Sequence, residues 1–182
     1  MKRIKFFGMF ILTAVISGNI SAQTKMVGGA AMYPTKNIVE NAVNSKDHTT
    51  LVAAVKAAGL VSTLESAGPF TVFAPTNEAF DALPGGTVET LLKPENKAKL
   101  TSILTYHVVP GKYSSMDLMK MVKAGNGKAT LKTAEGEGLY ITMKGKNLMV
   151  TDENGHTAKI TIADVNQSNG VIHVINAVLL PK

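Results

Sequence analysis

The sequence predicts an α+β domain in which strands from distant parts of the chain share a sheet. Three observations support this fold class. Apolar residues recur at helical spacing in several segments between residues 37 and 123. After Gly127, short β-rich segments alternate with glycine-containing turns, which is typical of an antiparallel meander. A strand of β-branched and aromatic residues, Phe70–Phe73, lies far upstream, so the sheet has to combine early and late strands.

Helices are expected first along the chain. In the segment 49–58 the apolar residues fall at positions i, i+1, i+4 and i+7, and Gly59 follows where helix ends favour glycine. Asp47 or Thr49 is expected to cap this helix. The helices expected in this part are 37–43, 49–58 and 60–66.

Further helices are expected after the strand 70–73. Thr76 or Asn77 is expected to cap a short helix that runs through Phe80. Pro94 suits the first turn of a longer helix. Ser114 and Asp117 have the spacing of a capping box. The helices expected here are 77–80, 87–92, 95–104 and 114–123.

Strands dominate the last third of the chain. Asn154-Gly155 and similar glycine-containing pairs separate the β-rich segments and indicate tight hairpins. The strands expected in this part are 129–133, 139–143, 147–151, 156–162 and 171–180, and the last of them is split by Asn176.

The N-terminus is typical of a secretory signal peptide. Three cations within the first five residues precede the apolar run 6–16, and small residues end at Ala22. The sequence therefore predicts a signal peptide over 1–22, a flexible leader over 23–36 and a domain over 37–182. The apolar run is too short to span a bilayer, and no later run approaches the required length, so no transmembrane anchor is expected in the mature chain.

Export is expected to remove residues 1–22 and leave a chain that begins at Gln23. Intact-mass measurement of the exported protein checks this prediction. A folded, exported product that still begins at Met1 would contradict it.

The charge and the lack of cysteine argue against a nucleic-acid partner and against sites that depend on thiols. The 182 residues include 19 Lys and Arg, 13 Asp and Glu, and no Cys. Residues 1–22 hold the single arginine and two lysines, so the mature chain has 16 lysines and a net charge of +3. Arginine dominates recognition of guanine and is favoured for phosphate, so a nucleic-acid partner is not expected. Without cysteine there is no disulfide, thiol nucleophile or thiolate zinc site.

Three segments, in order and at matching spacing, carry a family resemblance. They are Gly68–Phe80 with the following Leu83-Pro84, Leu104–Gly111 with its Tyr106-His107 pair, and Asn169–Asn176 with the following 178–181. Together they resemble the fasciclin domain, an extracellular adhesion module, over most of the mature chain. Asn176 departs from the aspartate that many members carry.

The resemblance implies a wedge of two β-sheets with helices packed around it, in agreement with the α+β prediction. It implies a small secreted or periplasmic bacterial protein that is not an enzyme. The implied function is cell adhesion or association with an extracellular matrix or cell surface, and the implied partner is an extracellular or cell-surface protein or polysaccharide. The alternative is a periplasmic protein that binds a small ligand or a metal.

Tyr106 and His107 are the candidate binding residues. In the resembled family this segment is connected with adhesion, which is the functional hypothesis. The structural hypothesis is that Tyr106 buries its ring with a satisfied hydroxyl, while His107 ties the end of a helix to a strand.

The other motif residues are expected to build the core and its turns. They are Phe70, Phe73, Pro75, Thr76, Asn77, Phe80, Gly170, Ile172 and His173. His48 and His156 are expected to be exposed. No two histidines have the spacing of a local metal site, and no nucleophile elbow is present, so no catalytic residue, metal or cofactor is predicted.

Overall fold

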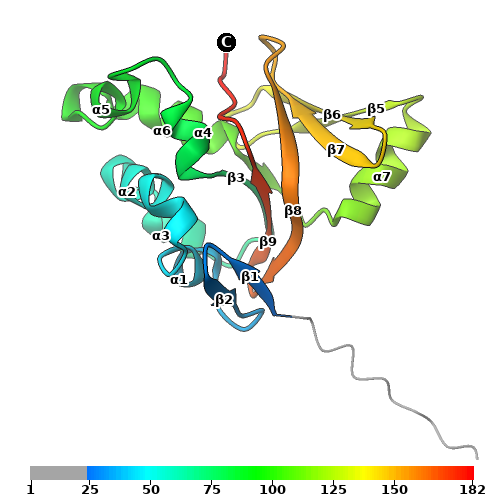
Figure 1. The fold of residues 1–182 in the computed structure, drawn as a ribbon, viewed down its shortest axis with the longest axis horizontal. Coiled ribbons are helices and arrows are strands. Elements are labelled where there is room, and N and C mark those ends of the chain that lie inside the picture. The colour runs from blue at the N-terminus through cyan, green and yellow to red at the C-terminus, as the bar shows by residue number, and fades with distance from the viewer. Residues whose placement is uncertain (1–23) are drawn as a thin grey trace, which may run out of the picture.

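The computed structural model describes residues 24–182 and shows a bent seven-stranded sheet with helices packed against it (Figure 1). This arrangement confirms the predicted α+β class. The predicted signal peptide, 1–22, lies outside the described residues and stays a prediction.

Helices predominate among the described residues up to Ala124, and every later element is a strand. The strands are β1 Lys25–Val27, β2 Ala30–Met32, β3 Phe70–Pro75, β4 Val108–Pro110, β5 Lys128–Lys132, β6 Gly138–Lys144, β7 Asn147–Thr151, β8 Thr157–Gln167 and β9 Gly170–Ile175. The helices are α1 Ile38–Ala42, α2 Thr49–Ala58, α3 Val61–Glu65, α4 Asn77–Asp81, α5 Thr87–Leu91, α6 Lys97–Tyr106 and α7 Ser115–Ala124, with short 3-10 turns η1 Lys46–His48 and η2 Pro94–Asn96.

The sheet joins early and late strands, as the sequence predicts. Its order is β4-β3-β9-β8-β7-β6-β5, and β3 pairs in parallel with β9 while every other neighbouring pair is antiparallel. Gly170 is required where β3 and β9 start side by side, because a Cβ there would lie 2.1 Å from the Phe70 carbonyl oxygen.

The long strand β8 divides the sheet into the two parts of the wedge. Its first residues pair with β7, and most of its length pairs with β9 through two register shifts. Asp164 lies within the irregular stretch and has a φ of 56°. Such bulges bend a strand and increase its twist, so one continuous strand serves both parts of the wedge.

Two apolar cores fill the two parts of the wedge. Helices α1–α6 pack one core against β3 and β9, whereas α7 packs the other against β5–β8. Figure 1 shows α1–α3 and α7 on opposite sides of the central strands. Alternate side chains of β3 enter different cores, with Val72 in the first and Phe73 in the second.

The flexible leader expected over 23–36 is wrong for the part that the structure describes. Residues 25–32 form the hairpin β1–β2, and Val27 and Met32 are 4% and 2% exposed in the first core. The segment forms a hairpin because Gly28 and Gly29 take positive φ values of 56° and 75°, which a tight turn between strands favours. Small, glycine-rich composition therefore marks a turn here.

Two strand boundaries also differ from expectation. β8 continues to Gln167 rather than ending at Ile162, because its residues beyond Ile162 pair with β9 after a register shift. β9 ends at Ile175, directly before the expected split at Asn176, and the pattern does not resume as a strand up to Leu180. There the Asn176 side-chain oxygen accepts a hydrogen bond of 2.7 Å from the Lys159 N–H, beyond the last pair of the β8–β9 ladder.

Candidate functional site

The Tyr106-His107 pair lies where α6 ends and the edge strand β4 begins. Leu100, Ile103 and Leu104 bury one face of α6 in the first core, which fixes the direction in which the helix delivers the pair. Tyr106 is 0% exposed and His107 is 2% exposed. Neither side chain is therefore accessible to a partner in this fold.

Both ring nitrogens of His107 are engaged with the backbone. Nδ1 lies 2.8 Å from the Ile103 carbonyl oxygen, and Nε2 accepts a hydrogen bond of 3.1 Å from the Leu179 N–H. These two partners require a neutral ring that carries its proton on Nδ1. Burial lowers the pKa of His107 to about 4, although the Ile103 carbonyl and the Asp152 carboxylate act in the opposite direction.

The Tyr106 hydroxyl joins α6 to the second part of the wedge. It donates a hydrogen bond of 2.8 Å to the Gly138 carbonyl and accepts one of 3.2 Å from the Glu153 N–H. Burial raises the pKa of Tyr106 to about 12, which keeps the hydroxyl protonated at physiological pH.

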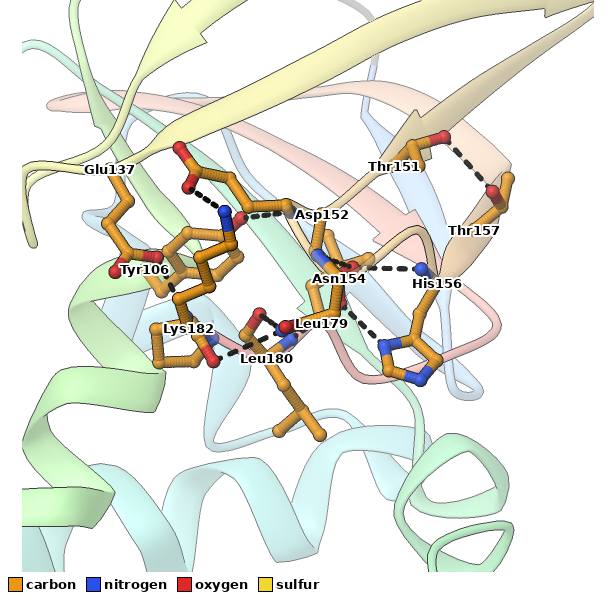
Figure 2. A network of polar contacts seen from close by, with 12 residues as sticks. Tyr106, Glu137, Thr151, Asp152, Asn154, His156, Thr157, Leu179, Leu180 and Lys182 are labelled. Atoms are coloured by element: carbon orange, nitrogen blue, oxygen red, sulfur yellow. Dashed lines mark hydrogen bonds and ion pairs between the residues drawn. The ribbon is translucent and has the colours of Figure 1, made fainter.

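Asp152 is 1% exposed, and its side chain accepts hydrogen bonds from the turn between β7 and β8 and from the C-terminal segment (Figure 2). One carboxylate oxygen accepts the N–H groups of Asn154 and His156 at 2.9 and 2.8 Å. The other accepts the Leu180 N–H at 3.0 Å and pairs with His156 Nδ1 at 3.1 Å. Asp152 thus fixes both its own turn and the C-terminal segment.

The exposed side chains around this network come from the same loop and the C-terminus. Asn154 donates to the Leu180 and Pro181 carbonyls, and His156 keeps 62% of its side chain exposed. Lys182 lies 3.8 Å from Glu153 across the same surface. We define these three exposed residues, Asn154, His156 and Lys182, as the network surface.

The structure places most of the other motif residues in the interior. Phe73, Pro75, Phe80, Gly170, Ile172 and His173 are buried, whereas Phe70, Thr76 and Asn77 are half-buried. His173 stacks on Phe73, donates from Nε2 to the Tyr113 carbonyl at 2.9 Å, and accepts the Asp164 N–H at Nδ1. Burial lowers its pKa, and Lys25 adds to this shift, against the opposing effects of the Tyr113 carbonyl and Asp164.

Thr76 and Asn77 cap two different helices. Thr76 accepts the Ala79 N–H at the start of α4, as expected. Asn77 accepts the Thr50 N–H at 3.0 Å and donates to the Lys46 carbonyl at 2.8 Å, so it caps α2 from a distant part of the chain. The expectation that Asp47 or Thr49 caps α2 is therefore wrong, because Asn77 supplies that acceptor.

Sequence reasoning missed the burial of two polar residues, of which Asp152 organises the site and His48 lies in the wall of the first core. Asp152 belongs to a segment that reads as a simple hairpin turn. His48, expected to be exposed, is 3% exposed and lies 2.8 Å from the Ser45 hydroxyl through Nδ1. The Asp-Glu-Asn-Gly segment indicates a turn but carries no signal that its first carboxylate reaches the C-terminal segment.

Stability is expected to decrease as the pH falls from about 6.5 toward about 4. The fold lowers the pKa of His48, His107 and His173, chiefly through burial. Below the ordinary histidine pKa of 6.5, the unfolded chain therefore binds protons that the folded chain excludes, and unfolding is favoured. Urea unfolding at about pH 7 and about pH 4.5 measures the difference. Equal or greater stability at the lower pH would contradict this assignment.

Among residues 24–182, no helix combines the length and apolar character needed to cross a bilayer. The described residues also contain no group of three or more histidine and acidic side chains placed to hold a metal ion.

This chain is similar to a known protein family and to individual proteins over most of its length. The family model of the Fasciclin domain matches residues 46–181. Protein sll1483 of Synechocystis sp. is 49% identical over 159 residues, covering 87% of this chain and 81% of that protein. Immunogenic protein MPB70 of Mycobacterium bovis is 37% identical over 193 residues, covering 96% of this chain and 91% of that protein.

A solved structure shares the fold. It is a FAS1 domain pair from the insect cell adhesion molecule fasciclin I, with a TM-score of 0.70 at 18% identity. The match covers 78% of this chain and 50% of the domain pair.

Proposed function

This chain belongs to the fasciclin domain family, and we propose that it is an exported, non-catalytic module for cell adhesion or association with an extracellular matrix or cell surface. The proposed location is secreted or periplasmic. The proposed partner is an extracellular or cell-surface protein or polysaccharide. The insect protein whose domain pair shares this fold is described as a cell adhesion molecule, which supports this class of function.

The observation that carries the proposal is the burial of Tyr106 and His107 beneath an exposed surface. Their polar atoms hydrogen-bond to Gly138, Glu153, Ile103 and Leu179. In this proposal the pair stabilises the fold beneath the network surface and makes no contact with the partner. A partner then contacts Asn154, His156 and Lys182, while Tyr106 and His107 stay inside.

The state of the buried histidines supports a non-catalytic role. General acid–base catalysis needs a titratable group within reach of a substrate. His107 and His173 are both buried and have both ring nitrogens in hydrogen-bonding contact with backbone groups. Neither imidazole is available to exchange a proton with a bound molecule.

Attachment of the mature chain tests the proposed function. The purified chain is assayed for retention by whole cells, matrix protein and extracellular polysaccharide. Retention by at least one of them is expected, and His156→Ala is expected to weaken it because this side chain is 62% exposed on the network surface. Lys93→Ala, on an exposed residue between α5 and α6, serves as the matched control. Absence of retention in all three assays would contradict the proposed function.

A small-ligand function is the second candidate, because one feature of the first core favours it. That feature is an apolar cavity beside α1–α3.

A further inference from the structure

The first core contains a cavity of about 80 Å³ between helices α1–α3 and the strands β3 and β9. Its wall includes Ile38 of α1, Val55 of α2, Leu64 of α3, Val72 of β3 and Ile172 of β9. Figure 1 shows these helices beside the two strands. The hairpin β1–β2 contributes Val27 and Met32, so the segment expected to be a leader forms part of the wall.

Most of the wall is hydrocarbon, and its interior polar atoms, with the exception of Nε2 of His48, have partners within the fold. The Thr105 hydroxyl donates to the Thr101 carbonyl, and both nitrogens of His107 are engaged. Ser45 and His48 contact each other, while Nε2 of His48 makes no hydrogen bond. Burial lowers the pKa of His48, against opposing effects of the nearby Ala74 carbonyl and Asp47, so a neutral ring faces the apolar wall.

The cavity is large for an apolar interior. A cavity needs about 10–15 Å³ to hold one buried water, so this cavity is several times larger than that minimum. Protein cores usually pack without voids of this size. Water gains little in such a space because it finds few polar partners there, whereas a hydrocarbon fills it and restores the missing contacts.

The cavity reaches the surface beside two exposed residues. Lys56 of α2 and Thr63 of α3 both line it, and both are exposed. Within residues 24–182, Lys56 forms no ion pair, so its ammonium group is available to an anion. A molecule that enters here meets a cation first and apolar side chains behind it.

We propose that this cavity binds the hydrocarbon chain of a small carboxylate amphiphile, such as a medium-chain fatty acid, with its carboxylate at Lys56. The chain lies among Val55, Leu64 and Ile172, which contribute apolar contacts. The carboxylate stays at the exposed end and pairs with the lysine. This site is separate from the network surface, so it adds a ligand to the proposed attachment function.

Octanoate titration of the mature chain, followed by NMR of isotope-labelled methyl groups, tests the proposal. Saturable shifts are expected at the cavity methyl groups of Ile38, Val55, Leu64 and Ile172. Lys56→Glu is expected to weaken octanoate binding at least tenfold and to leave 1-octanol binding within about twofold, because the alcohol carries no charge. Absence of saturable shifts at these methyl groups, or unchanged octanoate affinity in Lys56→Glu, would overturn the proposal.

Filling the cavity provides an independent test. Val55→Phe is expected to weaken octanoate binding at least tenfold, because the added ring occupies the space. Ala53→Phe, at an exposed position on the same helix, is the matched control and is expected to bind as the unmodified chain does. If Val55→Phe does not fold, Ala42→Leu in α1 replaces it, since Ala42 also lines the cavity. Unchanged affinity in a folded cavity-filling variant would overturn the proposal.

Discussion

Asp152→Ala is expected to lower the free energy of unfolding by about 3–5 kcal/mol. The carboxylate is buried and accepts the N–H groups of Asn154, His156 and Leu180. Alanine removes these acceptors together, and each buried donor that is left unpaired costs about 1–3 kcal/mol. The loss is smaller than the sum because the loop and the C-terminal segment relax toward water. Urea unfolding at neutral pH measures the change.

The matched control for this variant is Asp81→Ala, which removes an exposed carboxylate at the end of α4. A change within about 0.5 kcal/mol is expected for the control. A similarly small loss in Asp152→Ala would show that the C-terminal segment is held without this carboxylate, and it would remove the basis for the network surface.

Ile172→Ala is expected to cost about 2–5 kcal/mol of unfolding free energy. Ile172 is 7% exposed in β9, where it pairs with Val72 of β3 and with Val165 of β8. Truncation removes buried hydrocarbon and leaves a void in the first core, where the neighbouring strands allow little collapse. Denaturant unfolding of the two proteins gives the difference.

Val43→Ala is the control for Ile172→Ala, because Val43 is 48% exposed at the end of α1. A change within about 0.5 kcal/mol is expected there. A loss below about 0.5 kcal/mol in Ile172→Ala would place this side chain at the surface and contradict the central position of β9.

Apolar spacing and capping residues predict those helices and strands whose ends are determined by neighbouring residues in the sequence. The helix 49–58 has the predicted bounds, because its apolar spacing and Gly59 lie within the segment itself. Ser114 and Asp117 form the predicted capping box through contacts only three residues apart. The β-branched and aromatic residues of Phe70–Phe73 predict a strand, and β3 begins at Phe70.

Helix caps, hydrogen bonds and burial that depend on residues far apart in the sequence could not be predicted from the pattern within one segment. Asn77 caps a helix that begins 28 residues earlier, and Asp152 accepts the Leu180 N–H 28 residues later. His48 is polar and lies beside a charged residue, so its burial follows only from how η1 packs in the fold. These contacts exist only once the sheet has brought separate segments together.

The Tyr106-His107 segment illustrates the same division. Its place at the helix-to-strand junction was evident from the sequence, but whether the side chains face a partner or the interior was open. The decisive partners, Ile103, Leu179 and Gly138, come from one nearby turn of helix and two distant segments. Burial and saturated hydrogen bonding favour the structural hypothesis.

His107→Ala, measured for unfolding and for attachment to cells on the same samples, tests most directly whether the pair supports the fold rather than contacts a partner. The account predicts a lower unfolding midpoint, because the Ile103 carbonyl and the Leu179 N–H lose their partner. It also predicts unchanged attachment per folded molecule, because His107 does not reach the surface. Stability within about 0.5 kcal/mol of the unmodified chain, together with lost attachment, would contradict the account and assign His107 to the adhesive contact.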